Sequence, residues 1–175
     1  MAEYEFTLRY ALPTENQDAQ AYLPALEKAG CDDALIGVGR RGRIALEFVR
    51  EARSAEAAMT SALKAVAKAI PRARLVQVEP DLVGLTELAE VFGCSRQNMR
   101  KTALSNPDFP VPVHEGEPEL YHLAEVLDWA QENGRIHAKS SARELCAVAM
   151  QVNLAKELNK LPRRRVRLSI SAAVA

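Results

Sequence analysis

Residues 85–104 constrain the fold most strongly, because they have the pattern of two short helices joined by a tight turn. Leu88, Ala89 and Phe92 share one face of the first pattern, at whose start Thr86 can act as a cap. Gly93-Cys94-Ser95 interrupts the pattern, and Ser95 can cap a second helix over 96–104. Ala89 is small enough for two helices to approach closely, and Gly93 tolerates the positive φ that the turn needs.

The second of these helices has a polar outward face. Cys94, Met99 and Ala103 can point back to the first helix. The side chains that remain outward are Arg96, Gln97, Asn98, Arg100 and Lys101. These are the residue types that contact phosphates and base edges in the major groove of DNA. The two patterns therefore predict a helix-turn-helix that binds double-stranded DNA.

A hairpin and a closing helix are expected next. Residues 109–113 and 120–122 are short extended patterns on either side of a turn rich in glycine and proline. Residues 123–133 have helical spacing, with Val126, Leu127 and Ala130 inward and Trp129 beneath the hairpin. The hairpin corresponds to the wing of a winged helix-turn-helix.

The stretches LTELAEVFGCSRQNMRK, FPVPV and ELYHLAEVLDWA resemble the winged helix-turn-helix of MerR-like and phage-excisionase proteins. The resemblance covers residues 85–131 and departs from the usual pattern at Cys94, where valine is common. It also departs at Glu115, Glu117 and Glu119, because the wing is acidic rather than basic. It implies DNA contacts by Ser95, Arg96, Gln97, Arg100 and Lys101. We expect Thr86 and Asn98 to belong to the same DNA-binding site. With an acidic wing, we expect binding to depend on the recognition helix and on pairing of two subunits.

The N-terminal part has the order strand, helix, strand, strand, helix, strand. The strands are expected at 4–10, 34–38, 43–50 and 74–78, and the helices at 19–29 and 54–69. This order predicts a ferredoxin-like βαββαβ domain in an α+β protein. The expected domains are 1–80, the winged helix-turn-helix at 82–134, and a C-terminal helix with a basic tail at 135–175. By analogy with ACT-like domains, the first could serve dimerisation or bind a small-molecule effector.

The C-terminal segment has an amphipathic helical pattern over 141–161. Its stripe is formed by Leu145, Val148, Val152, Ala155 and Leu158. The stripe must be buried either on the N-terminal domain or across a homodimer, and we favour the dimer. The tail Arg163-Arg164-Arg165-Val166-Arg167 is either a solvated end or an arm that contacts phosphates.

Charge is unevenly distributed although the net charge is zero. Residues 1–81 carry 11 basic and 12 acidic side chains, residues 82–134 carry 3 and 9, and residues 135–175 carry 9 and 2. A broad basic face for unspecific phosphate contacts is therefore not expected. The sequence shows neither a signal-peptide layout nor an apolar run of membrane-spanning length, so we expect a cytoplasmic protein.

No constellation of catalytic or metal-ligating residues is apparent. Cys31, Cys94 and Cys146 are widely spaced, and Asp32-Asp33 is typical of a loop. Gly37-x-Gly39-x-x-Gly42 falls in a hairpin rather than at a helix start, so it does not suit a phosphate. Strand 43–50 lacks the paired aromatics of RNA-binding sheets. We expect no enzyme activity and no cofactor.

The sequence as a whole predicts a homodimeric, sequence-specific DNA-binding regulator of transcription, of bacterial or phage type. The alternative is a protein–protein adaptor or antitoxin whose N-terminal domain binds a partner protein.

Overall fold

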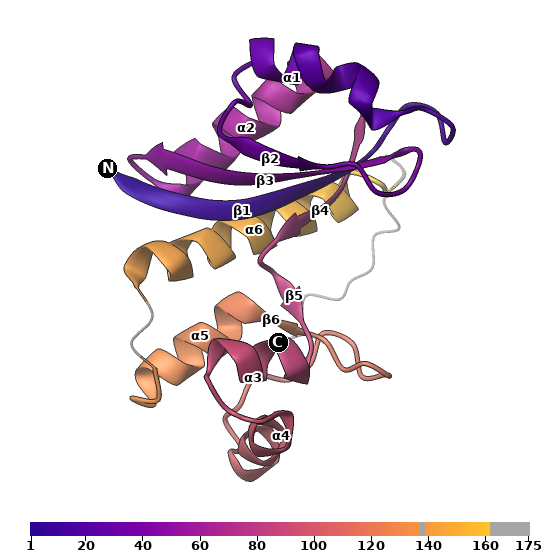
Figure 1. Ribbon diagram of the computed structural model, residues 1–175. Helices are drawn as coiled ribbons and strands as arrows, with labels where there is room; N and C mark the ends of the chain where they lie inside the picture. The colour runs from indigo at the N-terminus through magenta and orange to yellow at the C-terminus, as the bar shows by residue number, and fades with distance from the viewer. Residues whose placement is uncertain (137–138, 162–175) are drawn as a thin grey trace.

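The computed structural model describes residues 1–136 and 139–161, and it is a mixed α+β protein (Figure 1). The expected basic tail at 163–167 lies outside the described residues. Across the described residues there are six α-helices and a four-stranded antiparallel sheet, together with a small two-stranded sheet. None of these helices is both long enough and apolar enough to cross a membrane.

The larger sheet has the strand order β2-β3-β1-β4. Its strands are β1 (Ala2–Ala11), β2 (Ala34–Gly37), β3 (Arg43–Ala52) and β4 (Arg74–Glu79), close to the predicted bounds. β1 pairs with β3 along its whole length, from Ala2 opposite Ala52 to Ala11 opposite Arg43. β4 pairs only with Thr7–Ala11 of β1. Among residues 1–136 and 139–161, the first half of β1 therefore has a neighbouring strand on one side only.

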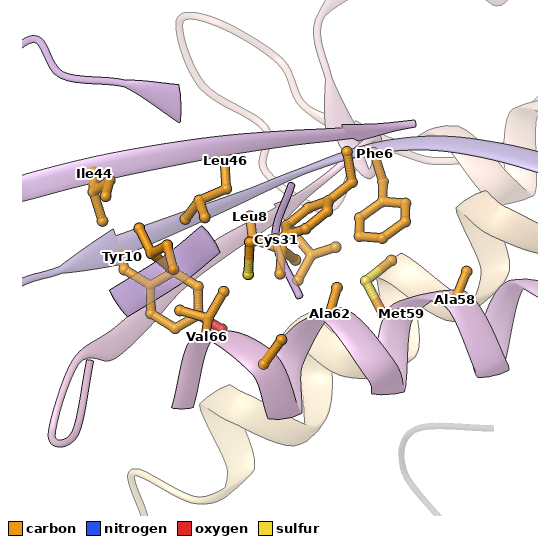
Figure 2. Packing of buried hydrophobic residues seen from close by; sticks show 14 of the residues in the cluster. Phe6, Leu8, Tyr10, Cys31, Ile44, Leu46, Ala58, Met59, Ala62 and Val66 are labelled. Carbon is orange, nitrogen blue, oxygen red and sulfur yellow. The ribbon is translucent and has the colours of Figure 1, made fainter. Parts of the chain in front are cut away.

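One face of this sheet forms the larger apolar core (Figure 2). The alternating residues Tyr4, Phe6, Leu8 and Tyr10 of β1 are all buried, as a period of two requires. Phe6 stacks on Phe48 of β3, with ring centroids 5.3 Å apart. Helix α2 (Ala55–Ala69) covers these side chains with its own buried stripe, which includes Met59, Ala62 and Val66.

The helices on this face begin where the sequence supplies caps. Ser54 accepts a hydrogen bond from the backbone N–H of Ala57 and so starts α2. The expected helix at 19–29 is instead a 3-10 turn (Ala19–Tyr22) followed by α1 (Leu23–Lys28). Pro24 explains the division, because proline fits the first turn of an α-helix, where its missing N–H is not needed.

Helix α6 (Ser140–Leu158) packs on the same core. Leu145 and Ala149 are buried there, and Val148 and Val152 are partly buried against it. These residues of the apolar stripe are thus covered by the same chain. The sequence analysis favoured burial across a homodimer instead. Beyond Val152 the stripe is open, since Leu158 is 66% exposed. A homodimer remains a prediction, but burial of this stripe no longer requires one.

A second, smaller apolar core lies below the first in Figure 1. It is formed around β5 (Leu82–Val83), α3 (Leu85–Val91), α4 (Arg96–Ser105), β6 (Tyr121–His122) and α5 (Leu123–Glu132). β5 pairs antiparallel with β6, a pairing that the sequence did not predict. As expected, Val126, Leu127 and Ala130 of α5 point inward.

Two local expectations in this part were wrong. Thr86 does not cap α3, because the N-cap is Gly84, whose N–H donates to Oε2 of Glu87 at 3.0 Å. Residues 109–113 do not form a strand. The hairpin consists of the bridge between His114 and Leu120, because Pro110 and Pro112 have no N–H to donate to a strand partner.

A buried polar cluster joins the two cores. Asp81 is 1% exposed, and its Oδ1 lies 2.6 Å from Nδ1 of His122. Asn153 of α6 donates from Nδ2 to Oδ2 of Asp81 at 2.7 Å and to the carbonyl oxygen of Val78 at 2.8 Å. Its Oδ1 accepts from the N–H of Val78 at 2.9 Å. Asn153 therefore satisfies the outer edge of β4 and one side of a buried carboxylate.

Replacing Asn153 by alanine should lower the free energy of unfolding by about 2–4 kcal/mol, because the Val78 backbone groups and Asp81 lose partners in a partly buried site. Urea unfolding followed by circular dichroism measures this. The neighbouring exposed residue gives the control, and Gln151→Ala should change the free energy of unfolding by less than about 0.5 kcal/mol. Equal effects of the two substitutions would contradict the role given to Asn153.

Candidate nucleic-acid interface

The turn between α3 and α4 is built as the sequence indicates. Gly93 has a φ of +62°, in the left-handed region that favours glycine. The N–H of Cys94 donates to the carbonyl oxygen of Ala89 at 2.9 Å, which closes the end of α3. Ser95 then starts α4, its side-chain oxygen accepting from the N–H of Asn98 at 3.1 Å. The direction of α4 is thus set by hydrogen bonds on both sides of the turn.

Helix α4 is attached to the smaller core by one face. Met99 is 2% exposed, and Cys94 and Ala103 are partly buried against the same core. The opposite face is polar. All seven predicted site residues are exposed, namely Thr86, Ser95, Arg96, Gln97, Asn98, Arg100 and Lys101. The burial of Met99 thereby fixes which side chains of α4 face solvent.

Two shallow hollows bring these seven residues together on one surface. The first, of about 470 Å³, is lined by Thr86, Arg96 and Arg100 and by the carboxylate residues Glu87, Glu117 and Glu119. The second, of about 620 Å³, is lined by Ser95, Gln97, Asn98, Arg100, Lys101, Leu104 and Ser105. Arg100 lines both hollows and is therefore the centre of this surface, which we call the α4 surface.

The cations of the α4 surface have no acidic partner among the described residues. Arg96, Arg100 and Lys101 form no ion pair within residues 1–136 and 139–161. By contrast, Arg9 pairs with Glu79 and Arg50 pairs with Asp33. Unpaired cations on a surface are available to an anionic ligand, so this surface is suited electrostatically to a polyanion.

The hairpin beside α4 is acidic, as the sequence indicated. Glu115, Glu117 and Glu119 are exposed on it. Tyr121 donates its hydroxyl to Oε2 of Glu119 at 3.1 Å. Burial of the phenol, and then this hydrogen bond, raise the pKa of Tyr121 to about 12. Tyr121 is therefore a neutral hydrogen-bond donor at physiological pH, and it holds one of the three carboxylates in place.

Trp129 of α5 supports the segment that leads into the hairpin. Its indole packs edge-on against Phe109, with ring centroids 4.8 Å apart, and its Nε1 donates to Oδ2 of Asp108 at 3.0 Å. This hydrogen bond is the main cause of a lowered pKa of Asp108. The guanidinium of Arg135 covers the same indole at 5.1 Å. The 107–110 segment is thus held on α5 by Trp129, whereas the sequence predicted Trp129 beneath the hairpin itself.

Sequence reasoning missed an apolar component next to the α4 surface. Leu104 and Val111 are each 78% exposed, and Val113 is 55% exposed. Leu104 lies four residues after Arg100 and so falls on the same side of α4. That spacing was visible in the sequence, but no orientation was predicted for Leu104.

Comparisons with known proteins found no matching family model, no matching curated protein and no matching solved structure. The case for a function of the α4 surface therefore depends on its geometry and on the sequence resemblance.

Asp108→Asn should lower stability at pH 7 and should lose this effect in acid. A carboxylate whose pKa is lowered in the folded state stabilises the fold above its unfolded pKa of about 3.9, and this contribution disappears as pH falls through the folded pKa. Urea unfolding at pH 7 and near pH 3, followed by the fluorescence of the single tryptophan, measures the difference. Glu132→Gln, also exposed, should follow the wild type at both pH values. A deficit of Asp108→Asn that is equal at both pH values would refute the assignment.

Proposed function

We propose that this chain is a sequence-specific double-stranded DNA-binding protein of the winged helix-turn-helix kind found in MerR-like and excisionase proteins. The observation that carries the proposal is the α4 surface. Cationic and amide side chains are exposed together on one face of a helix whose opposite face is anchored by Met99. Arginine reads guanine and the amides of Asn and Gln read adenine in the major groove.

The order of elements in residues 82–134 supports this proposal. Helices α3 and α4, joined at Gly93, are followed by the 114–120 hairpin and then by α5. The side chains of α5 share the smaller apolar core with those of α3 and α4. The ten residues of α4 form a helix about 15 Å long, which is long enough to present two turns of side chains to a groove about 12 Å wide. In Figure 1, α4 lies at the end of the molecule opposite the larger sheet, so nothing described in the chain covers its outer side.

The strand order of residues 1–80 supports a ferredoxin-like assignment for this part. The order β4-β1-β3-β2, with α1 and α2 packed on one face, matches the split βαβ plan. The two apolar cores support domain boundaries near residue 81, while α6 contributes to both cores. In the proposed regulator the first domain, by analogy with ACT-like domains, would serve pairing or effector binding.

We further propose that the protein acts as a cytoplasmic homodimer through occupancy of a site rather than through catalysis. Two copies would place their α4 helices about 34 Å apart, one turn of duplex, on an inverted repeat. Transcription regulation follows from such occupancy at a promoter.

Arg100→Ala should weaken binding to a selected duplex about 5- to 150-fold. Arg96→Ala should make the slope of log affinity against log salt concentration less steep, by the share of about one phosphate contact. The duplex is obtained by selection from a random-sequence pool with the wild-type protein, and affinities are measured by fluorescence anisotropy at several salt concentrations. Arg41→Ala removes an exposed arginine of the β2–β3 turn and is the matched control, with little change expected. Unchanged affinity in both α4 variants would exclude direct contact by this helix.

A protein–protein adaptor, such as an antitoxin, is the second candidate. In the sequence-based form of this alternative, the N-terminal domain binds the partner protein. The observation that favours an adaptor is the acidic hairpin with its exposed apolar neighbours Leu104, Val111 and Val113, a combination suited to a basic protein surface.

Exchanging Glu115, Glu117 and Glu119 together for glutamine separates the two candidates. If α4 lies in the major groove, the carboxylates of the hairpin repel the backbone, and their removal should raise DNA affinity several-fold at low salt but little at high salt. Anisotropy titrations of the triple variant measure this. DNA affinity that stays the same or falls would mean that the hairpin is not near DNA, and would favour the adaptor.

A further inference from the structure

Leu104 is an apolar side chain within the otherwise polar α4 surface. It is 78% exposed and lines the hollow of about 620 Å³ on the outer side of α4. The other residues that line this hollow are all polar, namely Ser95, Gln97, Asn98, Arg100, Lys101 and Ser105. The polar contacts proposed for the α4 surface thus leave Leu104 without a role.

The fold of the described residues does not use Leu104 either. Met99 attaches α4 to the smaller core, with Cys94 and Ala103 partly buried beside it, and Leu104 is not among the residues of that core. Single exposed leucines are common on protein surfaces, so the exposure of Leu104 alone indicates no function. Its position on the helix is more informative.

Leu104 lies on the same side of α4 as Gln97. The two residues are about two helical turns apart, and Lys101 lies between them, about one turn from each. This side of the helix is opposite Met99, which is 2% exposed. Arg100 lines the same hollow as Leu104 and also a second hollow with it, of about 550 Å³, towards the hairpin. Leu104 is therefore aligned with the side chains that the proposed function assigns to base edges.

Thymine carries an apolar group at its major-groove edge, the C5-methyl, whereas the other groups displayed there are hydrogen-bond donors and acceptors. A leucine beside base-reading side chains suits this methyl, because covering a donor or acceptor with an apolar group leaves it unpaired. Along the helix axis Leu104 is about 6 Å from Arg100 at 1.5 Å per residue, which corresponds to about two base steps of 3.4 Å. The two side chains can reach base edges together only if α4 lies along the groove.

The charges around Leu104 favour DNA over a protein partner. Arg100 and Lys101 line the same hollow, and none of the described residues that line it is acidic. Neither cation forms an ion pair within residues 1–136 and 139–161. A duplex brings phosphates for the two cations and thymine methyls for Leu104 to the same groove.

We propose that Leu104 contacts the C5-methyl of a thymine about two base pairs from the guanine that Arg100 reads, with α4 lying along the major groove. This inference rests on the proposed function, because it requires α4 to enter DNA. It adds to that function a residue that selects thymine by an apolar contact, and it fixes the direction of α4 relative to the groove.

Deoxyuridine substitution tests the proposal, because it removes only the methyl group of a thymine. The full-length protein selects a duplex from a random-sequence pool, and each thymine of that duplex is exchanged singly for deoxyuridine. The guanine read by Arg100 is the one whose exchange weakens binding of the wild type but not of Arg100→Ala. Exchange of a thymine about two base pairs from it should lower the affinity about fourfold, the effect of about one buried methyl group. Fluorescence anisotropy at a fixed salt concentration measures these affinities.

Two leucine variants complete the test. Leu104→Ala should bind the thymine and the deoxyuridine duplexes with equal affinity, because the side chain that senses the methyl is gone. Leu35→Ala removes a leucine of β2 that is 72% exposed and is the matched control, so it should keep the fourfold difference. Both positions are exposed, and thermal unfolding of both variants should match the wild type.

The outcomes separate this inference from the proposed function. A fourfold difference that persists in Leu104→Ala would overturn the inference, and so would a wild type that binds every deoxyuridine duplex as tightly as the thymine duplex. If Arg100→Ala still weakens binding in these cases, the proposed function stands, and Leu104 with Val111 fits a protein partner instead. A pool from which the wild type selects no duplex would overturn both.

Discussion

The buried carboxylate of Asp81 is the point on which the arrangement of the two cores depends. It accepts a hydrogen bond from Asn153 of α6 and lies against His122 of β6, while the carbonyl oxygen of the same residue accepts from the N–H of Leu123 at 2.8 Å. A buried charge without partners is strongly destabilising, so all three groups must stay in place together. Asp81 also lies directly between β4 and β5, which belong to different sheets.

Helix α6 connects the two cores because its side chains belong to both. Leu145 and Ala149 are buried in the larger core, and Cys146, on the adjacent face, is buried in the smaller one. Burial raises the pKa of the Cys146 thiol to about 11, so it is present as an uncharged apolar group. The position of α3 and α4 relative to the sheet is therefore determined by a helix that follows both in sequence.

The sequence predicted those features that depend on periodicity and on local caps. The alternation of Tyr4 to Tyr10 placed β1, Ser54 and Ser95 placed the starts of two helices, and Met99 separated the two faces of α4. Features that depend on contacts between distant residues were missed. β5 is only two residues long and exists because β6 lies beside it, and the Gly84 cap depends on the side chain of Glu87. The sequence did not decide what covers the apolar stripe of α6, since such a stripe has the same pattern whatever packs on it.

The candidate site was more predictable than its surroundings because exposure follows from helical spacing once one buried residue is known. Its partner does not follow in the same way, since a net charge of zero argues against nucleic acid whereas the local charge of α4 argues for it. The zero net charge and the local positive charge of α4 are compatible if the acidic hairpin has a role in binding. Carboxylates close to the duplex would reduce the sequence-independent attraction to phosphates and leave base contacts by α4 with a larger share of the binding energy. In the proposed regulator, weak unspecific binding and a small recognition surface would together favour specificity over raw affinity.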